Sequence, residues 1–581
     1  MGKRDKQETI FNTQHLYLDY VGRDTIYGYL SENRHHIFRD EQFTELYCAD
    51  NGRPSVAPSL AASILFLLAF EGVSFVEAIA RTKYDLRWKV ALGLQLEEEP
   101  IQKSALQEFE ARLVLHEKGE EMIRISFQEA RRAGYLKSRK IRVALDTTPI
   151  LGKGAVKDTY NLLADGIVTL MGTLAEVSGQ DIETWGKQYD FSRYLESSIK
   201  GQADIDWNDK RQKNELLRQI VCDGKRLLSL AAESAKNHLE QADRIATDSA
   251  LLQRLIQQDV EEVPGGGVKI KQGTEKDRVI STHDPEMRHG RKSASHRFDG
   301  HKAAVATDID SQLITAVQVI AGNAGDQEKA LQLVEQSERV AQAKVEETVG
   351  DCAYGGGPTR REFEEEGRKL TAKVPSLTNG DHFSKQDFQV DLDKMQVRCP
   401  AGKVTGDYQP IGKDRAGRFT FSLEDCQICR LRDQCVKGKG ARTISIQPQE
   451  RLQQQARLYN QTPEGKEILR ARVVVEHRIA RLVRLGIRKS RYFGRKKTCF
   501  QLIMAAVVAN LTLVAGFRMK QITVTAISAL IASLLLICIQ QAIKLTQKAC
   551  VRLTDLFCYF LVWAEIPFFK PTKYPAFRMR L

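Results

Sequence analysis

The chain has 581 residues, of which 42% are hydrophobic and 28% charged. This composition excludes an intrinsically disordered protein and predicts a globular chain of about two to four structural units. The 87 Lys and Arg residues outnumber the 74 Asp and Glu residues and give a net charge of +13. Such a charge favours a polyanionic partner, although a basic globular protein without one would have the same charge. An odd number of cysteines, 11, and a polar amino-terminal segment without the apolar core of a secretory signal favour a reduced, cytoplasmic compartment.

The first part of the chain is predicted to be helical. Residues 1–37 are expected to be an amino-terminal arm, and residues 38–135 to be a helical domain. The apolar run SLAASILFLLAF over 59–70 is typical of a buried helix, and a Gly-Arg-Pro turn at 52–54 precedes it.

Residues 136–516 are predicted to form one α/β domain with two insertions. A helical insertion is expected at about 150–290, and a Gly-rich, strand-like insertion with four cysteines at about 376–450. The segment IRVALD predicts a strand that ends in Asp146. Further along, the pattern predicts a strand pair over residues 302–308 and 313–320 and a helix over 326–336. It then predicts a strand over 345–349, which ends before Asp351, and a helical segment over about 463–516.

Three acidic residues occupy positions that suit a divalent-metal site. Asp146 and Asp351 end two predicted strands, and Glu476 lies on a predicted helix whose neighbours are mostly basic. Two-metal phosphodiester chemistry needs clustered carboxylates, because Mg²⁺ takes oxygen ligands and the two ions lie roughly 4 Å apart. A single strand-terminal Asp is more often a cap or turn residue, so spacing alone leaves both interpretations open.

Several motifs together resemble a family. EGVSFVEAIA and KSALQEFEARL resemble the InsH-type amino-terminal domain, and VALDTTPI, VGDCAYGG and RVVVEHRIARLVRLGIRKSRYFGRKK resemble the strands and helix that carry three catalytic acids. Over about residues 38–516 the chain thus resembles bacterial insertion-sequence DDE transposases. The stretch DPEMRHGRKSASHRFDGHK resembles the family's Asp-Pro-Glu segment and the Phe-x-Gly-Tyr-Lys-like strand after it. In this chain, His301 stands where that strand usually has Tyr.

The resemblance implies an RNase H-like catalytic core that binds two Mg²⁺ or Mn²⁺ ions. Asp146, Asp351 and Glu476 would be the catalytic acids that hold the metal ions. The enzyme would cut the ends of an insertion sequence and join the 3′-hydroxyls to target DNA. It also implies double-stranded DNA as the partner, a homodimer on DNA, and a bacterial, nucleoid-associated location. Asp284 and Glu286 would be positioning groups, with a surface turn at Pro285 as the alternative. An inactive DNA-binding remnant is the alternative function.

Basic residues after the proposed glutamate favour DNA phosphate contacts. Arg472 lies four residues before Glu476, as the Tyr-Arg-Glu-Lys signature of related transposases requires, but Leu469 and Val483 replace the Tyr and Lys. Solvated surface cations are the alternative. The candidate DNA-binding residues are Arg472, Arg481, Arg484, Arg488, Lys489, Arg491, Arg495, Lys496 and Lys497.

The four cysteines of the second insertion suit a structural zinc site, because four thiolates can bind Zn²⁺ tetrahedrally. They are Cys399, Cys426, Cys429 and Cys435. Their spacing is unequal, so free thiols or a redox pair are the alternative.

Residues 517–581 form an apolar carboxyl-terminal extension. Its segment 522–539 contains no charge and reaches the lower length of a membrane span. We favour a divergent or accidental extension, for example from an altered reading frame, over a buried helix or a membrane anchor, so a membrane partner is not expected.

Overall fold

The computed structural model describes residues 2, 12–47, 55–196, 198–264, 267–293, 295–376, 378–411 and 416–563. The turn expected at residues 52–54 lies outside this set. The chain forms two compact units, Met1–Val514 and Ala515–Leu581. The first unit is a mixed α/β structure.

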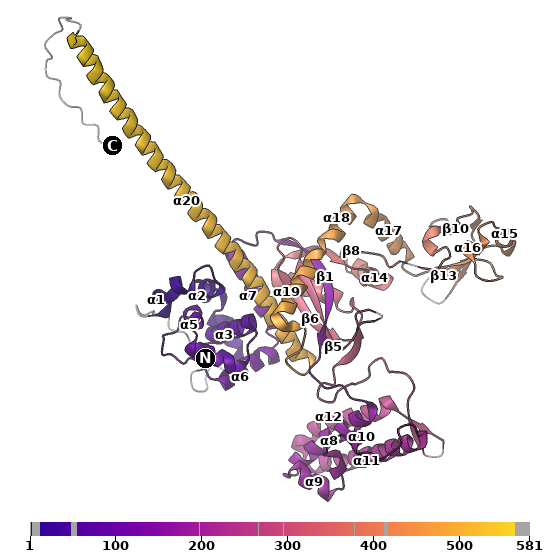
Figure 1. Ribbon diagram of the computed structural model, residues 1–581. Helices are drawn as coiled ribbons and strands as arrows, with labels where there is room; N and C mark the ends of the chain where they lie inside the picture. Colours follow the sequence, from indigo (N-terminus) through magenta and orange to yellow (C-terminus); the bar gives the residue numbers. More distant parts are fainter. Residues whose placement is uncertain are drawn as a thin grey trace. The chain divides into compact units, whose positions relative to one another are not determined.

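A group of helices begins the first unit (Figure 1). The apolar run predicted at 59–70 forms α3, and nearly all of its side chains are buried because it lies among the other helices. Residues expected to be an arm instead form α1 and α2, which pack against α5 and bury Leu18, Leu30 and Ile37. The helices of this region are α1 (Thr13–Val21), α2 (Ile26–Ile37), the 3-10 turn η1 (Asp40–Leu46), α3 (Pro58–Glu71), α4 (Phe75–Tyr84), α5 (Leu86–Leu92), α6 (Lys103–Leu115) and α7 (Gly119–Arg132).

A six-stranded mixed sheet lies at the centre of the first unit. Its main order is β4-β5-β1-β7-β8, and β6 also pairs with β5. Strands β4, β6 and β1 are antiparallel to β5, whereas β7 is parallel to both β1 and β8. The strands are β1 (Lys140–Leu151), β4 (Arg288–Arg291), β5 (Arg297–Asp308), β6 (Ile314–Ala321), β7 (Lys344–Gly350) and β8 (Leu370–Ala372). The predicted strand pair and the strand that precedes Asp351 are therefore present. The strand expected to end at Asp146 instead continues to Leu151, because it keeps pairing with β5, so Asp146 lies within β1.

Helices cover this sheet and complete its core. α13 (Ala330–Ala341) packs against β5, β6 and β7, and α19 (Val473–Leu482) packs against β1 and β5. Asn510 on α20 donates to the carbonyl of Ile314 at 2.9 Å and accepts from its N–H at 2.8 Å, so a side chain satisfies the backbone of β6.

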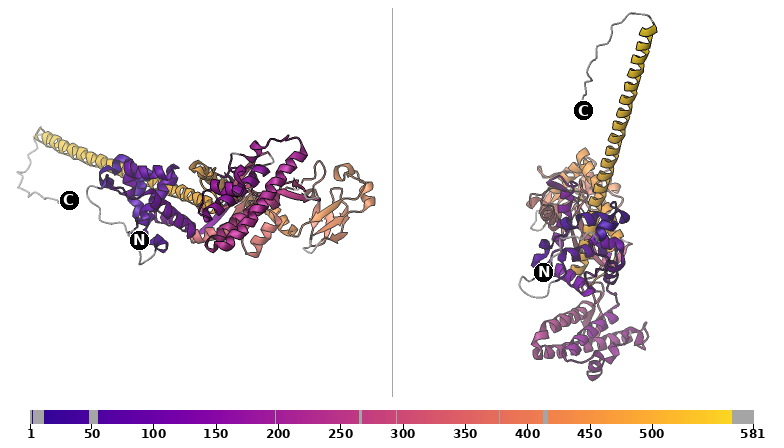
Figure 2. Two further views of the ribbon diagram at one scale, coloured as in Figure 1. Left: turned by 90° about the horizontal axis from the view of Figure 1, so that it is seen from below. Right: turned by 90° about the vertical axis from the view of Figure 1, so that its left-hand side faces the viewer.

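The helical insertion has its own apolar core, in which α8, α11 and α12 pack on one another; Figure 2 shows these magenta helices from two further sides. It contains α8 (Thr159–Val177), α9 (Ile182–Gln188), η2 (Ser192–Tyr194), α10 (Ile199–Gln202), α11 (Lys210–Asn237), η3 (Leu239–Gln241) and α12 (Ala242–Asp259), followed by the hairpin β2 (Val260–Val263) and β3 (Gly267–Ile270).

The cysteine-bearing insertion is made of short strands around a small core that includes Phe388, Phe419 and Ile444. α14 (Gly357–Glu365) precedes it. Its elements are η4 (Lys385–Asp387), β9 (Gln389–Asp391), β10 (Gln396–Arg398), β11 (Val404–Thr405), β12 (Tyr408–Pro410), β13 (Gly417–Thr420), α15 (Leu423–Gln427), α16 (Arg432–Cys435) and β14 (Thr443–Ile446).

The helical segment expected from Pro463 to Gly516 is interrupted. After α17 (Glu450–Gln461), α18 (Pro463–Ala471) and α19, a π-helical turn at Val483–Ile487 contains Gly486 with a φ of 89°, a conformation that suits glycine. The chain then runs without a helix until α20 (Arg495–Trp563). This break gives the basic residues 488–494 an irregular backbone.

The second unit contains the end of α20, whose large apolar side chains from Val524 to Phe560 are exposed where the structure describes them. By length and composition alone, one described helix is able to cross a membrane, namely the Arg495–Phe560 stretch of α20. Two bent helix pairs pass the same test if each pair is taken as one span, Pro58–Glu71 with Phe75–Tyr84 and Thr159–Val177 with Ile182–Gln188.

Candidate active site

The register of β1 and β7 brings Asp146 and Asp351 to the same end of the sheet. Ala144 pairs with Val349 in parallel register, and each acid lies two residues further along its own chain. Neighbouring strands lie about 4.8 Å apart, and residues two positions apart project from the same face. The two carboxylates are therefore neighbours, as a shared site requires.

Glu476 joins this pair through Arg472. It lies in the first turn of α19, the helix that packs on β1. The Arg472 guanidinium donates to Asp146 Oδ2 at 3.3 Å and also forms an ion pair with Glu476. Side-chain exposure is 21% for Asp146 and 48% for Glu476, so the site opens to solvent on the glutamate side. The structure thus brings together all three predicted acids, with a cation between two of them.

The electrostatics of Asp146 reflect this crowding. Burial raises its pKa to about 6, and the carboxylates of Asp351 and Glu476 also raise it, whereas Arg472 and the N–H of Thr147 lower it. Clustered acids that repel one another in a half-buried place suit a bound cation, because the cation would remove the repulsion.

The donor chemistry fits Mg²⁺ or Mn²⁺, although the side chains are not gathered around a common point. Within the described part of the chain, no group of three or more His, Cys, Asp or Glu side chains is close enough together to hold a metal ion. Arg472 takes the place of a positive charge between Asp146 and Glu476. Movement of this one side chain would free carboxylate oxygens of both acids.

The basic segment Arg488–Lys497 lies beside the end of β1, just beyond Asp146. Leu151 N–H donates to the carbonyl of Arg488 at 2.9 Å, and Ser490 N–H donates to the carbonyl of Leu151 at 2.8 Å. The Arg488 guanidinium donates to Thr148 Oγ1 at 3.2 Å. These bonds hold the segment next to the strand that carries the first acid.

The nine candidate DNA-binding residues fall into two groups. Four of them form hydrogen bonds or ion pairs within the protein: Arg472 with the acids, Arg488 with β1, Arg491 with the carbonyl of Val73, and Arg495 with Glu286. A fifth, Arg481, is partly buried, and burial lowers its pKa. Arg484, Lys489, Lys496 and Lys497 are exposed, although Lys496 also lies 3.8 Å from Glu117 Oε1 in an exposed ion pair. The exposed group is the better placed to meet phosphates.

Asp284 and Glu286 form hydrogen bonds that hold part of the basic segment in place. Asp284 is fully buried and lies 3.2 Å from Nε2 of the equally buried His301, so it is not a surface-turn residue. Burial alone would raise the pKa of Asp284, but hydrogen bonds from His301 and the Gly494 N–H lower it below its usual value. Glu286 accepts from the N–H of Arg495 at 2.6 Å. Both acids therefore fix the turn that leads into α20.

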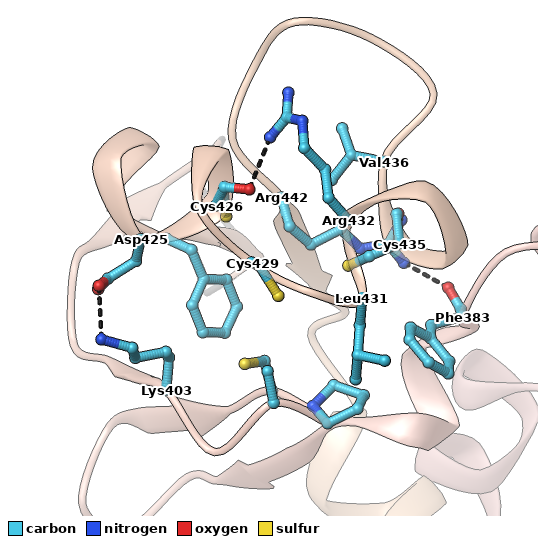
Figure 3. A pocket seen from close by; sticks show the side chains of 14 residues that line it. Phe383, Lys403, Asp425, Cys426, Cys429, Leu431, Arg432, Cys435, Val436 and Arg442 are labelled. Carbon is cyan, nitrogen blue, oxygen red and sulfur yellow. Dashed lines mark hydrogen bonds and ion pairs between the residues drawn. The ribbon is translucent and has the colours of Figure 1, made fainter.

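The four cysteines of the second insertion line one pocket (Figure 3). All four thiols are free, and Figure 3 shows the sulfur atoms of Cys429 and Cys435 directed into the pocket. Burial raises the pKa of Cys435, and the other three thiols raise it further. The four cysteines share a pocket lining, but their sulfur atoms do not form a metal-holding group in the described residues.

Tyr354 is a polar residue near the acids that the sequence analysis did not single out. Tyr354 is fully buried, and its hydroxyl has no hydrogen-bond partner in the residues that the structure describes. The only sequence signal is its place three residues after Asp351, in Asp-Cys-Ala-Tyr-Gly.

Comparison with protein families gives two matches. A model described as the transposase DDE domain matches residues 398–515, which include Glu476, the four cysteines and the basic segment. A model described as a transposase domain, DUF772, matches residues 30–112, within the amino-terminal helices. No curated protein and no solved structure matches the chain. The two family matches support the assignment of this chain to the insertion-sequence DDE transposases.

Proposed function

We propose that the chain cuts the ends of an insertion sequence and joins the freed 3′-hydroxyls to target DNA by two-metal chemistry. The observation that supports this proposal is the position of Asp146 and Asp351, each two residues beyond the parallel pair Ala144–Val349, with Glu476 linked to Asp146 through Arg472. The sheet, in which β5 is antiparallel and β7 parallel to β1, supports an RNase H-like core.

Each acid has a distinct part in this mechanism. Asp146 and Asp351 would hold the ions from the sheet, and Glu476 would complete the site from α19. When bound, two divalent ions would activate the attacking oxygen and stabilise the leaving one. Arg472 would leave its acid partners as positive charge arrives, and its guanidinium would then be free to contact a phosphate.

The DNA partner is inferred from the exposed cations beside the acids. Lys489, Lys496 and Lys497 are exposed on a segment that is fixed to β1 by backbone hydrogen bonds. Phosphate contacts at these residues would place the scissile bond near the acids. Two DNA ends must be cut, so we propose a homodimer on DNA, and a cytoplasmic, nucleoid-associated location follows from that substrate.

A structural zinc ion is proposed for the cysteine pocket. Four free thiols that line a common pocket are its support, and the sulfur atoms would have to close around the ion to reach the 2.3 Å of a zinc–sulfur bond. The ion would stabilise a small insertion whose apolar core is limited.

The decisive experiment uses DNA that carries the element's own ends, which the proposal expects to be inverted repeats flanking the gene. Purified protein is incubated with this DNA and Mg²⁺ or Mn²⁺, and cut and joined products are resolved on a sequencing gel. The proposal expects metal-dependent cutting at the repeat ends that stops when EDTA is added. Specific binding without cutting, under all metal conditions, would identify an inactive remnant instead.

A further inference from the structure

The chain folds back sharply after β7, and this turn determines where Tyr354 lies. Ala353 N–H donates to Asp351 Oδ1 at 2.8 Å, and Tyr354 N–H donates to the carbonyl of Asp351 at 3.3 Å. The tyrosine ring therefore returns over Gly350, where an added Cβ would lie 2.6 Å from Tyr354 Cβ. Such a distance is too short for two carbon atoms, so glycine at position 350 makes room for the ring.

The Tyr354 hydroxyl is buried without a partner. The side chain has 0% exposure, and its oxygen has no hydrogen bond to any residue that the structure describes. An unsatisfied buried hydroxyl costs about 1–3 kcal/mol. Buried tyrosines elsewhere in this chain avoid that cost; for example, Tyr160 donates to the carbonyl of Lys213 at 3.3 Å.

Three carboxylates lie near enough to this side chain to influence its ionisation. Burial raises the pKa of Tyr354 well above its usual value, and three carboxylates raise it further, those of Asp146, Asp326 and Asp351. Asp326 is held by the ammonium group of Lys302 at 2.8 Å. Ionised carboxylates only accept hydrogen bonds, and a tyrosine that keeps its proton is a donor.

We propose that Tyr354 is a positioning residue whose buried, unpaired hydroxyl donates to the carboxylate of Asp146 or Asp351 when divalent cations bind, and aligns that carboxylate for them. This inference rests on the proposed function, because it concerns the same acids. A hydroxyl that hydrogen-bonds one oxygen of a carboxylate leaves the other directed at the ion. Such support behind a metal ligand commonly contributes about 10–100-fold in metal affinity.

The test compares the full-length protein with its Tyr354→Phe variant by thermal denaturation across a series of Mn²⁺ concentrations, without DNA. The ring fits the same space, and no protein hydrogen bond is lost, so we expect the metal-free melting temperature to stay the same or rise slightly. The Mn²⁺ concentration that gives half of the maximal stabilisation should increase about 10-fold or more. Tyr160→Phe is the matched control, which should lower the metal-free melting temperature and leave the Mn²⁺ dependence unchanged.

The possible results separate this inference from the proposed function. If the wild-type protein cuts DNA and binds Mn²⁺ but Tyr354→Phe binds Mn²⁺ equally well, the role of Tyr354 is rejected while the function stands. If Tyr354→Phe fails to fold, the hydroxyl has a structural partner, and the inference is also rejected. If the wild-type protein neither binds Mn²⁺ nor cuts DNA, both proposals fail.

Discussion

The acid site and the cysteine pocket are both candidate metal sites, but the fold builds them differently. Asp146 lies within β1, Asp351 directly follows β7, which pairs with β1 in parallel, and Glu476 lies on a helix packed against β1. The cysteines lie on short strands, turns and one-turn helices around a small core. A site on regular elements is held in place before a ligand arrives, whereas a site on short elements depends more on the ligand itself.

Electrostatics separate the two regions further. At the acid site a resident cation, Arg472, already offsets the repulsion between carboxylates. In the cysteine pocket, burial raises the pKa of Cys435, and the other three thiols raise it further. Metal removal should therefore leave the acid site folded and destabilise the cysteine-bearing insertion.

The largest expected effect is on catalysis. Asp351→Asn keeps the shape of the side chain but removes a charged metal ligand, so DNA cutting should fall by at least about 1,000-fold, since a metal contributes several kcal/mol to such reactions. Cleavage of element-end DNA measures this. Asp310→Asn, which changes an exposed acid paired with Arg142, is the control and should retain activity. Equal activity of Asp351→Asn and the control would show that the acid site is not the reaction centre.

The next effect concerns the cysteine pocket. If zinc binds there, the purified protein should contain about one zinc per chain, and Cys429→Ser should lose it together with the protection of residues 383–446 from proteolysis. Metal analysis and limited proteolysis measure both. Cys222→Ser, which changes an exposed cysteine on α11, is the control. A protein without zinc whose insertion nevertheless resists protease would remove the contrast drawn between the two regions.

A third prediction concerns the pH dependence of stability. The pKa of Asp146 in the folded protein is about 6, above its usual 3.8. The folded state therefore binds this proton more tightly than the unfolded state, and stability is lost as pH rises from about 4 to about 6.

Asp146→Asn removes this loss. Without metal, the variant should be more stable than the wild type at pH 8 by up to about 3 kcal/mol, and the difference should shrink at pH 5. Thermal denaturation in EDTA at both pH values measures it, with Asp310→Asn again as the control. A difference that does not change with pH would contradict the assigned crowding of the acids.

The smallest expected effect is on DNA affinity. The double variant Lys496→Ala with Lys497→Ala should bind DNA about 10-fold more weakly, and the slope of log affinity against log salt should fall by about 2, because two phosphate contacts are lost. Fluorescence anisotropy across a salt series measures both. Changing Lys210 and Lys236, two exposed lysines on α11, provides the control. Identical slopes for both double variants would mean that DNA does not lie along the basic segment.

The sequence predicted the strands, the acids and the cysteines more fully than it predicted what lies between them. Alternating and continuous apolar runs identify β1, β5, β6 and β7. Asp351 directly follows such a run, whereas Asp146 lies within β1 and Glu476 lies on α19. The break at Gly486 and the docking of residues 488–490 on β1 depend on tertiary hydrogen bonds, which no local pattern reveals. The same holds for Tyr354, whose importance appears only once its burial is seen.

Helix α20 illustrates a different limit. Its helical pattern is clear from the sequence, but only the packing of residues such as Asn510 against β6 shows which part belongs to the first unit. Beyond Val514 the same pattern continues through exposed apolar residues. Periodicity predicts a helix well, but it does not identify the surface that covers it.

The most direct measurement is the anomalous X-ray scattering of Mn²⁺ in crystals grown with that ion. The account predicts two manganese peaks roughly 4 Å apart among the carboxylates of Asp146, Asp351 and Glu476, with Arg472 moved away from its acid partners. Crystals in which manganese is absent from these carboxylates, or binds only elsewhere, would contradict it.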